Sequence, residues 1–227
     1  MNFLPVLQKC PLFQGIDPSE LPVLLECLGA KTLTAEKRQT VLREGEPARF
    51  FGVVLEGAVQ ILQEDYFGNR SILGMAGPGE LFGESFACAG AESLPVSVVA
   101  VRDSVLLLVD SRRILSPCEK ACGFHRSILP NLMQIMALKN LAFHQKIQIT
   151  SRRTTREKLL AYLNGQAKVH GSAAFSIPFD RQGLADYLGV DRSGLSVEIG
   201  RLRADGILKC QKNHFILLEK RHKLWKL

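Results

Sequence analysis

The spacing of apolar residues changes character twice along the chain. Residues 2–29 carry apolar positions at helical spacing between turn signals at Gly15 and Gly29, which predicts short helices, one capped by Asp17. Between about residues 31 and 110, apolar runs become short and glycine turns separate them. The runs cover residues 51–55, 58–62, 71–73, 96–101 and 105–109. Short apolar runs with regular turns are typical of an antiparallel barrel, so this segment is expected to form a β-roll.

A long helical pattern follows Pro117, and its helix is expected to begin near Ile128 because proline is tolerated in a first turn, as at Pro130. Six positions are separated alternately by four and three residues: Leu129, Met133, Met136, Asn140, Phe143 and Ile147. This is the a/d spacing of a two-stranded coiled coil, and it predicts a homodimer seam. A second stripe, made of Ile128, Leu132, Ile135 and Leu138, would pack on the roll. Burial of both stripes inside one monomer is the alternative.

Residues 179–208 carry the signals of two short helices joined by a tight turn. Asp180 and Asp191 are placed to cap the helix starts, and Gly189 provides a left-handed turn between them. A hairpin about residues 212–213 follows, and a helix-turn-helix with such a hairpin is a winged helix. The expected fold class is therefore α+β, with three parts. These are an N-terminal antiparallel β-roll that senses an effector (1–115), a long connecting and dimerisation helix (116–150) and a C-terminal winged helix-turn-helix (151–227).

The positive charge of the chain is concentrated in its last third. Its formal net charge is +7, yet residues 1–145 carry 13 Lys and Arg against 15 Asp and Glu, whereas residues 146–227 carry 16 against 7. A basic module of this kind favours a polyanion partner, with a merely solvated basic surface as the alternative. Arg152, Arg153 and Arg156 form a basic entry to it, for which a hinge and a phosphate contact both remain open.

Composition argues against a membrane or secreted protein. The apolar runs are too short to span a bilayer, and the first residues lack the pattern of a signal peptide. The six cysteines, at positions 10, 27, 88, 118, 122 and 210, show no disulfide framework. A cytoplasmic protein with reduced thiols and no membrane partner is expected.

An enzyme built on the β-roll would need metal-binding histidines that point into it. The five histidines are at positions 125, 144, 170, 214 and 222, all beyond the roll. We therefore expect no enzyme, no metal and no cofactor. Cys118, Cys122 and His125 stand at C-x3-C-x2-H spacing, which leaves a redox- or metal-responsive regulator as an alternative.

The second helix of the pair supplies the candidate base readers. Arg192 can pair with guanine and Val197 can touch a thymine methyl, whereas Arg201 and the wing residue Lys212 are expected to meet phosphates. The candidate DNA-binding residues are Arg181, Arg192, Ser193, Ser196, Val197, Arg201 and Lys212.

Three stretches together resemble the cyclic-AMP-receptor and fumarate–nitrate-regulator (CRP/FNR) family of bacterial transcription regulators. They are Gly-Glu-Leu-Phe-Gly-Glu at 79–84, Leu-Ala-Asp-Tyr-Leu-Gly-Val-Asp-Arg-Ser at 184–193, and the hairpin. The resemblance implies a homodimer joined by the long helices, with an effector bound between roll and helix. It also implies an approximately palindromic site on double-stranded DNA, with RNA polymerase as a further partner. Family members often carry glutamate where Ser193 stands and arginine where Val197 stands, so their half-site does not carry over.

The resemblance also bears on the effector. In cyclic-nucleotide-binding members, a glutamate after Phe-Gly meets the ribose, and ten residues later an Arg-Ser/Thr pair holds the phosphate. Glu84 fills the first position, but Leu94 and Pro95 fill the second, so cyclic AMP is not expected. The chain is similar to a branch that includes sensors of halogenated phenols, which suggests a small aromatic or weakly acidic effector. A vestigial pocket filled by its own side chains is the alternative. The candidate effector residues are Phe82, Gly83, Glu84, Ser85, Phe86, Leu94, Val96 and Met133.

Overall fold

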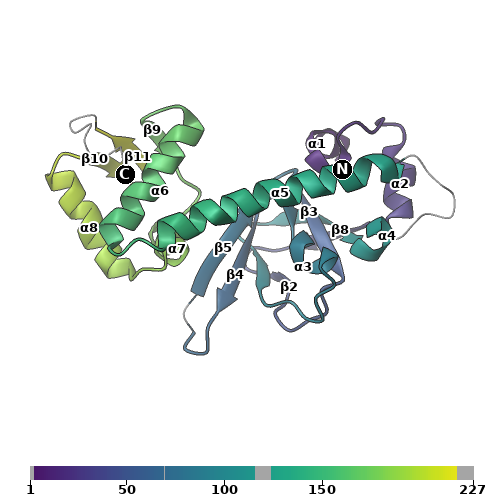
Figure 1. The fold of residues 1–227 in the computed structure, drawn as a ribbon, viewed down its shortest axis with the longest axis horizontal. Coiled ribbons are helices and arrows are strands. Elements are labelled where there is room, and N and C mark those ends of the chain that lie inside the picture. Colours follow the sequence, from purple (N-terminus) through teal and green to yellow (C-terminus); the bar gives the residue numbers. More distant parts are fainter. Residues whose placement is uncertain (1–2, 69, 116–123, 219–227) are drawn as a thin grey trace. The chain divides into compact units, whose positions relative to one another are not determined.

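The computed structural model of the chain describes residues 3–68, 70–115 and 124–218. It divides into two compact units, Met1–Leu141 and Ala142–Leu227 (Figure 1). The α+β class, with an antiparallel roll, a long helix and a winged helix-turn-helix, is confirmed. Along the described segments, no helix combines the length and apolar character needed to cross a membrane.

Two four-stranded antiparallel sheets form the roll of the first unit, in the orders β1-β8-β3-β6 and β2-β7-β4-β5. The strands are β1 (Lys31–Ala35), β2 (Thr40–Leu42), β3 (Phe50–Glu56), β4 (Val59–Glu64), β5 (Arg70–Ala76), β6 (Leu81–Phe82), β7 (Ser97–Ala100) and β8 (Ser104–Asp110). Each predicted β-run overlaps one of them, although residues 58, 96 and 101 lie just outside the strands. The neighbouring strands β3 and β6 approach closely at Gly52, where an added Cβ would lie 1.9 Å from the ring of Phe82. A glycine is therefore required at that point of β3.

Short helices precede and interrupt the roll: α1 (Leu4–Lys9), the 3-10 turn η1 (Pro11–Phe13), α2 (Leu21–Cys27), α3 (Glu84–Cys88) and α4 (Ser111–Leu115). The predicted helix start at Asp17 is wrong, because α2 begins at Leu21 after Glu20. The Asp17 carboxylate instead accepts hydrogen bonds from the amide and hydroxyl of Ser19, at 2.8 and 2.6 Å. These bonds stabilise a turn, a common use of aspartate before a helix.

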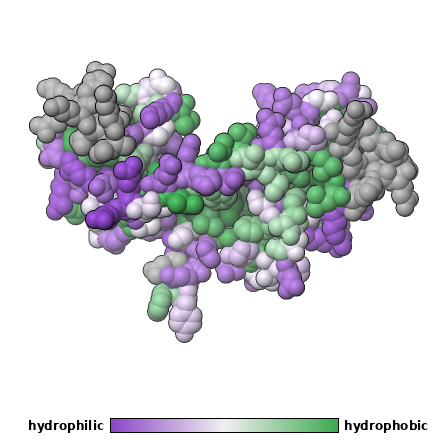
Figure 2. Space-filling model, in the orientation of Figure 1, coloured by the Kyte–Doolittle hydropathy of each residue, from purple (hydrophilic) through white to green (hydrophobic). Residues whose placement is uncertain are grey.

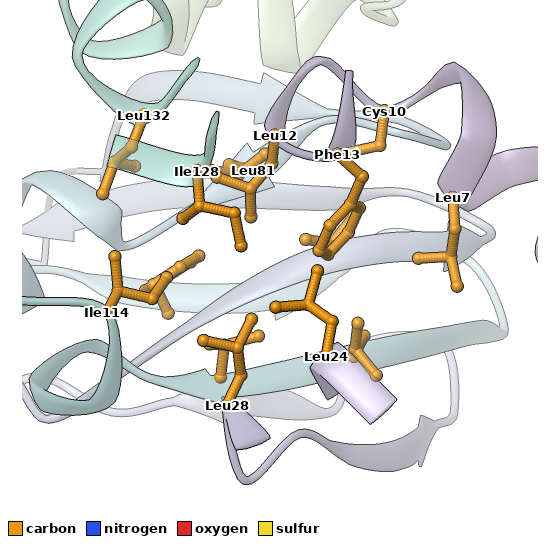
Figure 3. Packing of buried hydrophobic residues seen from close by; sticks show 14 of the residues in the cluster. Leu7, Cys10, Leu12, Phe13, Leu24, Leu28, Leu81, Ile114, Ile128 and Leu132 are labelled. Carbon is orange, nitrogen blue, oxygen red and sulfur yellow. The ribbon is translucent and has the colours of Figure 1, made fainter. Parts of the chain in front are cut away.

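The long helix α5 (Phe124–Thr150) begins four residues before the predicted start and carries Pro130 inside it. Ile128, Leu132 and Ile135 are buried in one cluster with residues of the roll and of the N-terminal helices (Figure 3). Leu138 was expected to complete this stripe, but 59% of it is exposed. Asn131 adds a polar anchor, since its Nδ2 donates to the carbonyl oxygens of Leu12 and Gln14, at 3.0 and 2.8 Å.

The second unit is a winged helix. It contains α6 (Thr155–His170), β9 (Ala174–Ser176), α7 (Arg181–Leu188), α8 (Arg192–Ala204), β10 (Leu208–Gln211) and β11 (His214–Leu217). Asp180 and Asp191 cap α7 and α8 through the amides of Gly183 and Gly194, as predicted. The hairpin about residues 212–213 is also confirmed, but the sheet has a third strand, β9, that the sequence pattern did not predict.

An aromatic cluster joins the end of α5 to this unit. The rings of Tyr162, Phe179 and Tyr187 pack together, with centroid distances of 5.0–6.4 Å. The ammonium group of Lys146 lies 4.5 Å from the centroid of Tyr187, a favourable cation–π arrangement. Burial lowers the pKa of Lys146 to about 8. The cation–π contact of Lys146 with Tyr187 fixes the last turns of α5 to α7.

Candidate effector site and nucleic-acid interface

The first residue of α3, Glu84, is a buried carboxylate with a cationic partner on α5. Gly83 precedes it with a φ of 77°, a left-handed conformation that glycine adopts without strain. Glu84 is 2% exposed, and its Oε2 lies 2.9 Å from Nζ of Lys139. The same ammonium group donates to the carbonyl oxygen of Leu81, at 2.6 Å. The candidate ribose contact of the sequence motif therefore carries an internal counterion in this chain.

Lys139 was missed from the sequence, although a signal for it exists. It follows Ile135 by four residues and Leu132 by seven, so it continues the stripe of α5 that faces the roll. Leu138, chosen instead, points elsewhere and stays exposed. A lysine at the end of an otherwise buried apolar stripe is a reason to look for a buried carboxylate opposite it.

The position of the family's phosphate-binding pair is closed to an anion. Leu94 is 2% exposed and packs in a core cluster of the roll. Its amide already donates to the carbonyl of Glu46 at 2.8 Å, and its carbonyl accepts from the amide of Gly45 at 2.9 Å. Pro95 has no amide hydrogen. Neither side chain nor backbone at residues 94 and 95 offers a donor to a phosphate.

The remaining candidate effector residues lie in different environments. Phe82 and Val96 are buried, Ser85 and Phe86 are half-buried, and Met133 is 71% exposed. The Ser85 hydroxyl donates to Oε1 of Glu84 at 3.2 Å. Glu84, Ser85 and Lys139 therefore form one polar group within the first unit.

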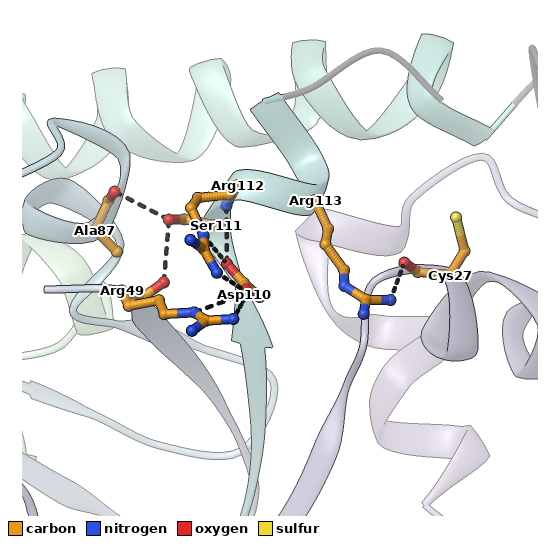
Figure 4. Close-up of polar contacts among 7 residues, drawn as sticks. All are labelled: Cys27, Arg49, Ala87, Asp110, Ser111, Arg112 and Arg113. Atoms are coloured by element: carbon orange, nitrogen blue, oxygen red, sulfur yellow. Dashed lines mark hydrogen bonds and ion pairs between the residues drawn. The ribbon is translucent and has the colours of Figure 1, made fainter. Parts of the chain in front are cut away.

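A second polar cluster anchors the far end of α3 (Figure 4). The Ser111 hydroxyl lies 3.0 Å from the carbonyl oxygen of Ala87 and 3.1 Å from that of Arg49. The neighbouring Asp110 accepts hydrogen bonds from the guanidinium groups of Arg49 and Arg112, at 2.8–3.2 Å. Burial alone would raise the pKa of Asp110, but the bonds from Arg112 and Arg49 outweigh it and lower the pKa to about 2. The helix that carries Glu84 is thus held at both ends.

One face of α5 leaves large apolar side chains in solvent. Figure 2 shows hydrophobic surface along the course of α5. The candidate seam residues Leu129, Met133, Phe143 and Ile147 are 37–71% exposed, Asn140 is exposed and Met136 is half-buried. A single chain therefore does not bury this stripe.

The predicted helix-turn-helix has the expected buried and exposed faces. Leu195, Ile199 and Leu202 of α8 are buried, whereas Arg192, Ser193, Ser196, Val197 and Arg201 are exposed. Arg181, the first residue of α7, is half-buried, and Lys212 is exposed at the hairpin turn with a φ of 53°. The outward surface of α8 is open over its whole length.

An ion-pair network between α6 and α8 was also missed. Arg156 donates to Glu198 at 3.1 Å and to Asp205 at 2.8 Å, and Arg201 lies 3.4 Å from Glu198. Glu198 is 8% exposed. Arg156 therefore links α8 to α6, whereas its use as a hinge or a phosphate contact stays untested.

Two family models match the two units. Residues 32–120 match the cyclic nucleotide-binding domain, and residues 157–227 match the Crp-like helix-turn-helix domain. The chain belongs to the CRP/FNR family of transcription regulators. It is thus a DNA-binding regulator with an effector-binding domain, and the proteins it matches are transcription regulators rather than enzymes.

Curated relatives of this CRP/FNR regulator match over different lengths. The transcriptional activator protein FnrL of Cereibacter sphaeroides is 25% identical over 191 residues, which cover 80% of this chain and 74% of the relative. The cyclic AMP receptor protein of Thermus thermophilus is 33% identical over 102 residues, 44% of this chain and 45% of the relative.

Solved structures share the fold. The c-di-GMP responsive regulator CLP of Xanthomonas campestris superposes with a TM-score of 0.74 at 20% identity, covering 90% of this chain and all of that one. FixK2 of Bradyrhizobium japonicum gives a TM-score of 0.65 at 22% identity, covering 84% and 93%.

The cysteines of this CRP/FNR regulator fall into two groups. Cys118 and Cys122, and the side chain of His125, lie outside the described residues, so the metal or redox alternative built on them stays untested. In the segments that the structure does describe, no group of three or more potential ligands could hold a metal. Burial raises the pKa of Cys10 and of Cys88 to about 11, and Glu84 adds to the rise at Cys88. Both thiols are therefore poor nucleophiles at neutral pH.

Proposed function

We propose that this chain is a homodimeric, sequence-specific transcription regulator whose effector is a small, weakly acidic aromatic compound rather than a cyclic nucleotide. The division into a sensor at 1–115, a dimerisation helix at 116–150 and a DNA-binding domain at 151–227 belongs to the same proposal, as do an approximately palindromic target and contact with RNA polymerase. The observation that carries the effector proposal is the ion pair of Glu84 with Lys139.

Two features argue against a cyclic nucleotide. The phosphate-binding position has no donor, since the Leu94 amide is already bonded to Glu46 and Pro95 has none. Losing a charge-assisted contact to a buried phosphate costs on the order of 2–5 kcal/mol, or roughly thirty- to several-thousand-fold in affinity. In addition, the Glu84 carboxylate is bonded to Lys139, so a ribose would have to displace that lysine.

The same pair supports an acidic guest. An ammonium group has three donor hydrogens. Lys139 donates one of them to the carbonyl oxygen of Leu81 and one to the Glu84 carboxylate. No third acceptor for this ammonium group lies among the described residues. The Lys139 side chain is 33% exposed, so an incoming anion can reach it. Halogen atoms make a phenol more acidic, so its oxygen would be a suitable third acceptor for Lys139. Phe86, half-buried and two residues after Glu84, is the candidate apolar contact for the phenol ring. A halogenated phenol is therefore the effector class that we propose.

Dimerisation is supported by the exposed stripe of α5. The six seam residues repeat at coiled-coil spacing, and all of them except the half-buried Met136 are exposed in one chain. A second copy of the same helix would cover them with matching residues, as a two-fold axis requires.

The test is DNA binding by the full chain, measured by fluorescence anisotropy on its own upstream DNA and on a site selected from random sequence. We expect 2,4-dichlorophenol to change the affinity by about 5- to 150-fold, the usual range of allosteric coupling, and cyclic AMP to leave it unchanged. Lys139→Met should abolish the response to the phenol. A large change in DNA affinity on addition of cyclic AMP would overturn the effector proposal.

A folding control is needed because Lys139→Met leaves Glu84 buried without its partner. Breaking a buried pair in this way costs about 3–5 kcal/mol, whereas the double variant Glu84→Gln with Lys139→Met should recover most of the stability. The double variant should therefore bind DNA and still ignore the phenol. If neither ligand changes DNA binding by the wild-type chain, the site is vestigial, while the DNA-binding function stands.

A further inference from the structure

The outward surface of α8 presents few groups that can read a base. Its buried side is formed by Leu195, Ile199 and Leu202. At about 100° per residue, the opposite side carries Ser193, Val197, Gly200 and Ala204, with Ser196 beside them. Apart from Val197, these residues have small side chains or none.

The two serine hydroxyls donate their hydrogens back into the protein. The Ser193 hydroxyl donates to the carboxylate of Asp191, the N-cap of α8. The Ser196 hydroxyl donates to the carbonyl oxygen of Arg192 at 2.9 Å. Neither hydroxyl is therefore oriented to donate to a base acceptor.

The arginines of α8 differ in whether their side chains already have a partner within the protein. Arg201 lies 3.4 Å from Glu198, so its guanidinium points back toward the ion-pair network. Arg192 is exposed at the first position of α8, and its side chain has no hydrogen bond or ion pair within the described part of the chain. Arg203 is also exposed, but it lies in the last turn, whereas helix-turn-helix proteins contact bases with the N-terminal part of this helix.

Val197 is the one sizeable apolar group on this surface. Its side chain is 54% exposed, and it follows Arg192 by five residues, still in the first half of α8. An exposed valine there cannot hydrogen-bond, but it can contact the C5-methyl group by which thymine is distinguished in the major groove.

We infer that direct base readout by α8 rests mainly on two side chains, with Arg192 selecting guanine and Val197 selecting thymine through its methyl group. This inference rests on the proposed sequence-specific binding of DNA. It gives Val197 a role that the family's usual arginine at this position cannot have, because a guanidinium reads guanine acceptors and not a methyl group.

The experiment is a double-mutant cycle in which one change removes the methyl group from the DNA and the other removes the valine from the protein. A site is first selected from random duplexes with the full chain. Each thymine of its half-site is then replaced by deoxyuridine, which lacks only the C5-methyl. Binding of the wild-type chain and of Val197→Ala is measured by anisotropy. We expect one thymine at which the wild type loses about three- to fivefold, the value of one buried methyl contact, and at which Val197→Ala loses nothing further.

Two further arms complete the design. Val169→Ala changes a valine of α6 that is 80% exposed and should retain the full deoxyuridine effect. Replacing guanines by 7-deazaguanine, which lacks the N7 acceptor, should lower the DNA affinity of the wild type about fivefold or more at one position and that of Arg192→Ala no further.

A methyl effect that is absent from the wild type, or that persists in Val197→Ala, overturns the role of Val197. If selection enriches no sequence at all, the proposed sequence-specific function fails as well, so the two failures are distinguishable.

Discussion

Asp110 shows how one buried side chain fixes a junction of the first unit. It ends β8, is 4% exposed, and receives both Arg49 and Arg112. Its pKa falls from a usual value of about 4 to about 2. A carboxyl group with a lowered folded pKa stabilises the fold fully above its unfolded pKa, and this contribution disappears as the pH falls through the folded pKa.

We therefore expect Asp110→Asn to lower the free energy of unfolding by about 1–2 kcal/mol at pH 6, because both arginines are half or more exposed and solvent screens part of the pairing. The gap between wild type and variant should close between about pH 4 and pH 2. Urea unfolding over this pH range measures it. Glu92→Gln changes an exposed carboxylate of the same unit and should stay within about 0.5 kcal/mol throughout. A gap that is independent of pH would contradict the assignment.

At the same scale, the helix caps of the second unit could be predicted from a local signal, whereas residues whose partner is distant were missed. The caps Asp180 and Asp191 act on amides three residues away, so the sequence suffices to place them. The bond of Lys139 to Glu84 spans 55 positions and that of Arg156 to Glu198 spans 42. Neither can be read from local spacing, because the fold decides which distant groups meet.

At the scale of elements, α5 presents three different surfaces. One is buried against the roll through Ile128, Leu132 and Ile135. The candidate seam lies on a second, where Met133 is 71% exposed. Leu138 lies on a third, with 59% exposure. Met133 and Leu138 are thus exposed apolar residues on two different faces of one helix.

This difference gives a matched test of the dimer. Met133→Glu places a charge from each protomer into the proposed seam, where like charges repel and cannot be hydrated, so we expect a monomer. Leu138→Glu adds the same charge at a similarly exposed site off the seam and should remain a dimer. Light scattering coupled to size-exclusion chromatography measures both masses. Dimers from both variants would place the interface elsewhere.

The element boundaries show where periodicity fails as a guide. The extension of α5 to Phe124 was missed because a proline inside a helix usually argues for a break. Strand β9 was missed because three residues cannot show an alternating pattern; it exists because its backbone pairs with β11. The roll and the helix pair were predicted because each repeats its signal several times.

For the whole molecule, the uneven distribution of charge indicates different functions for the two parts of the chain. Residues 146–227 carry 16 Lys and Arg against 7 Asp and Glu. Of these, Arg156 and Arg201 are used inside the protein by Glu198. The exposed wing residue Lys212 is a candidate phosphate contact, whereas Val197 is a candidate base contact. Phosphate contacts release counterions and base contacts to a methyl group do not, so salt dependence separates the two roles.

We expect the plot of log affinity against log salt to become shallower by about 2 in Lys212→Ala, since each of two protomers would lose one phosphate contact worth about 0.9. Val197→Ala should lower affinity at every salt concentration without changing this slope, because it removes no charge. Lys168→Ala, in which an exposed lysine of α6 is changed, tests whether any loss of charge has the same effect; we expect its slope to match the wild type. Equal slopes for Lys212→Ala and the wild type would remove the wing from the DNA interface. A shallower slope for Val197→Ala would mean that this face of α8 meets the phosphate backbone rather than the bases.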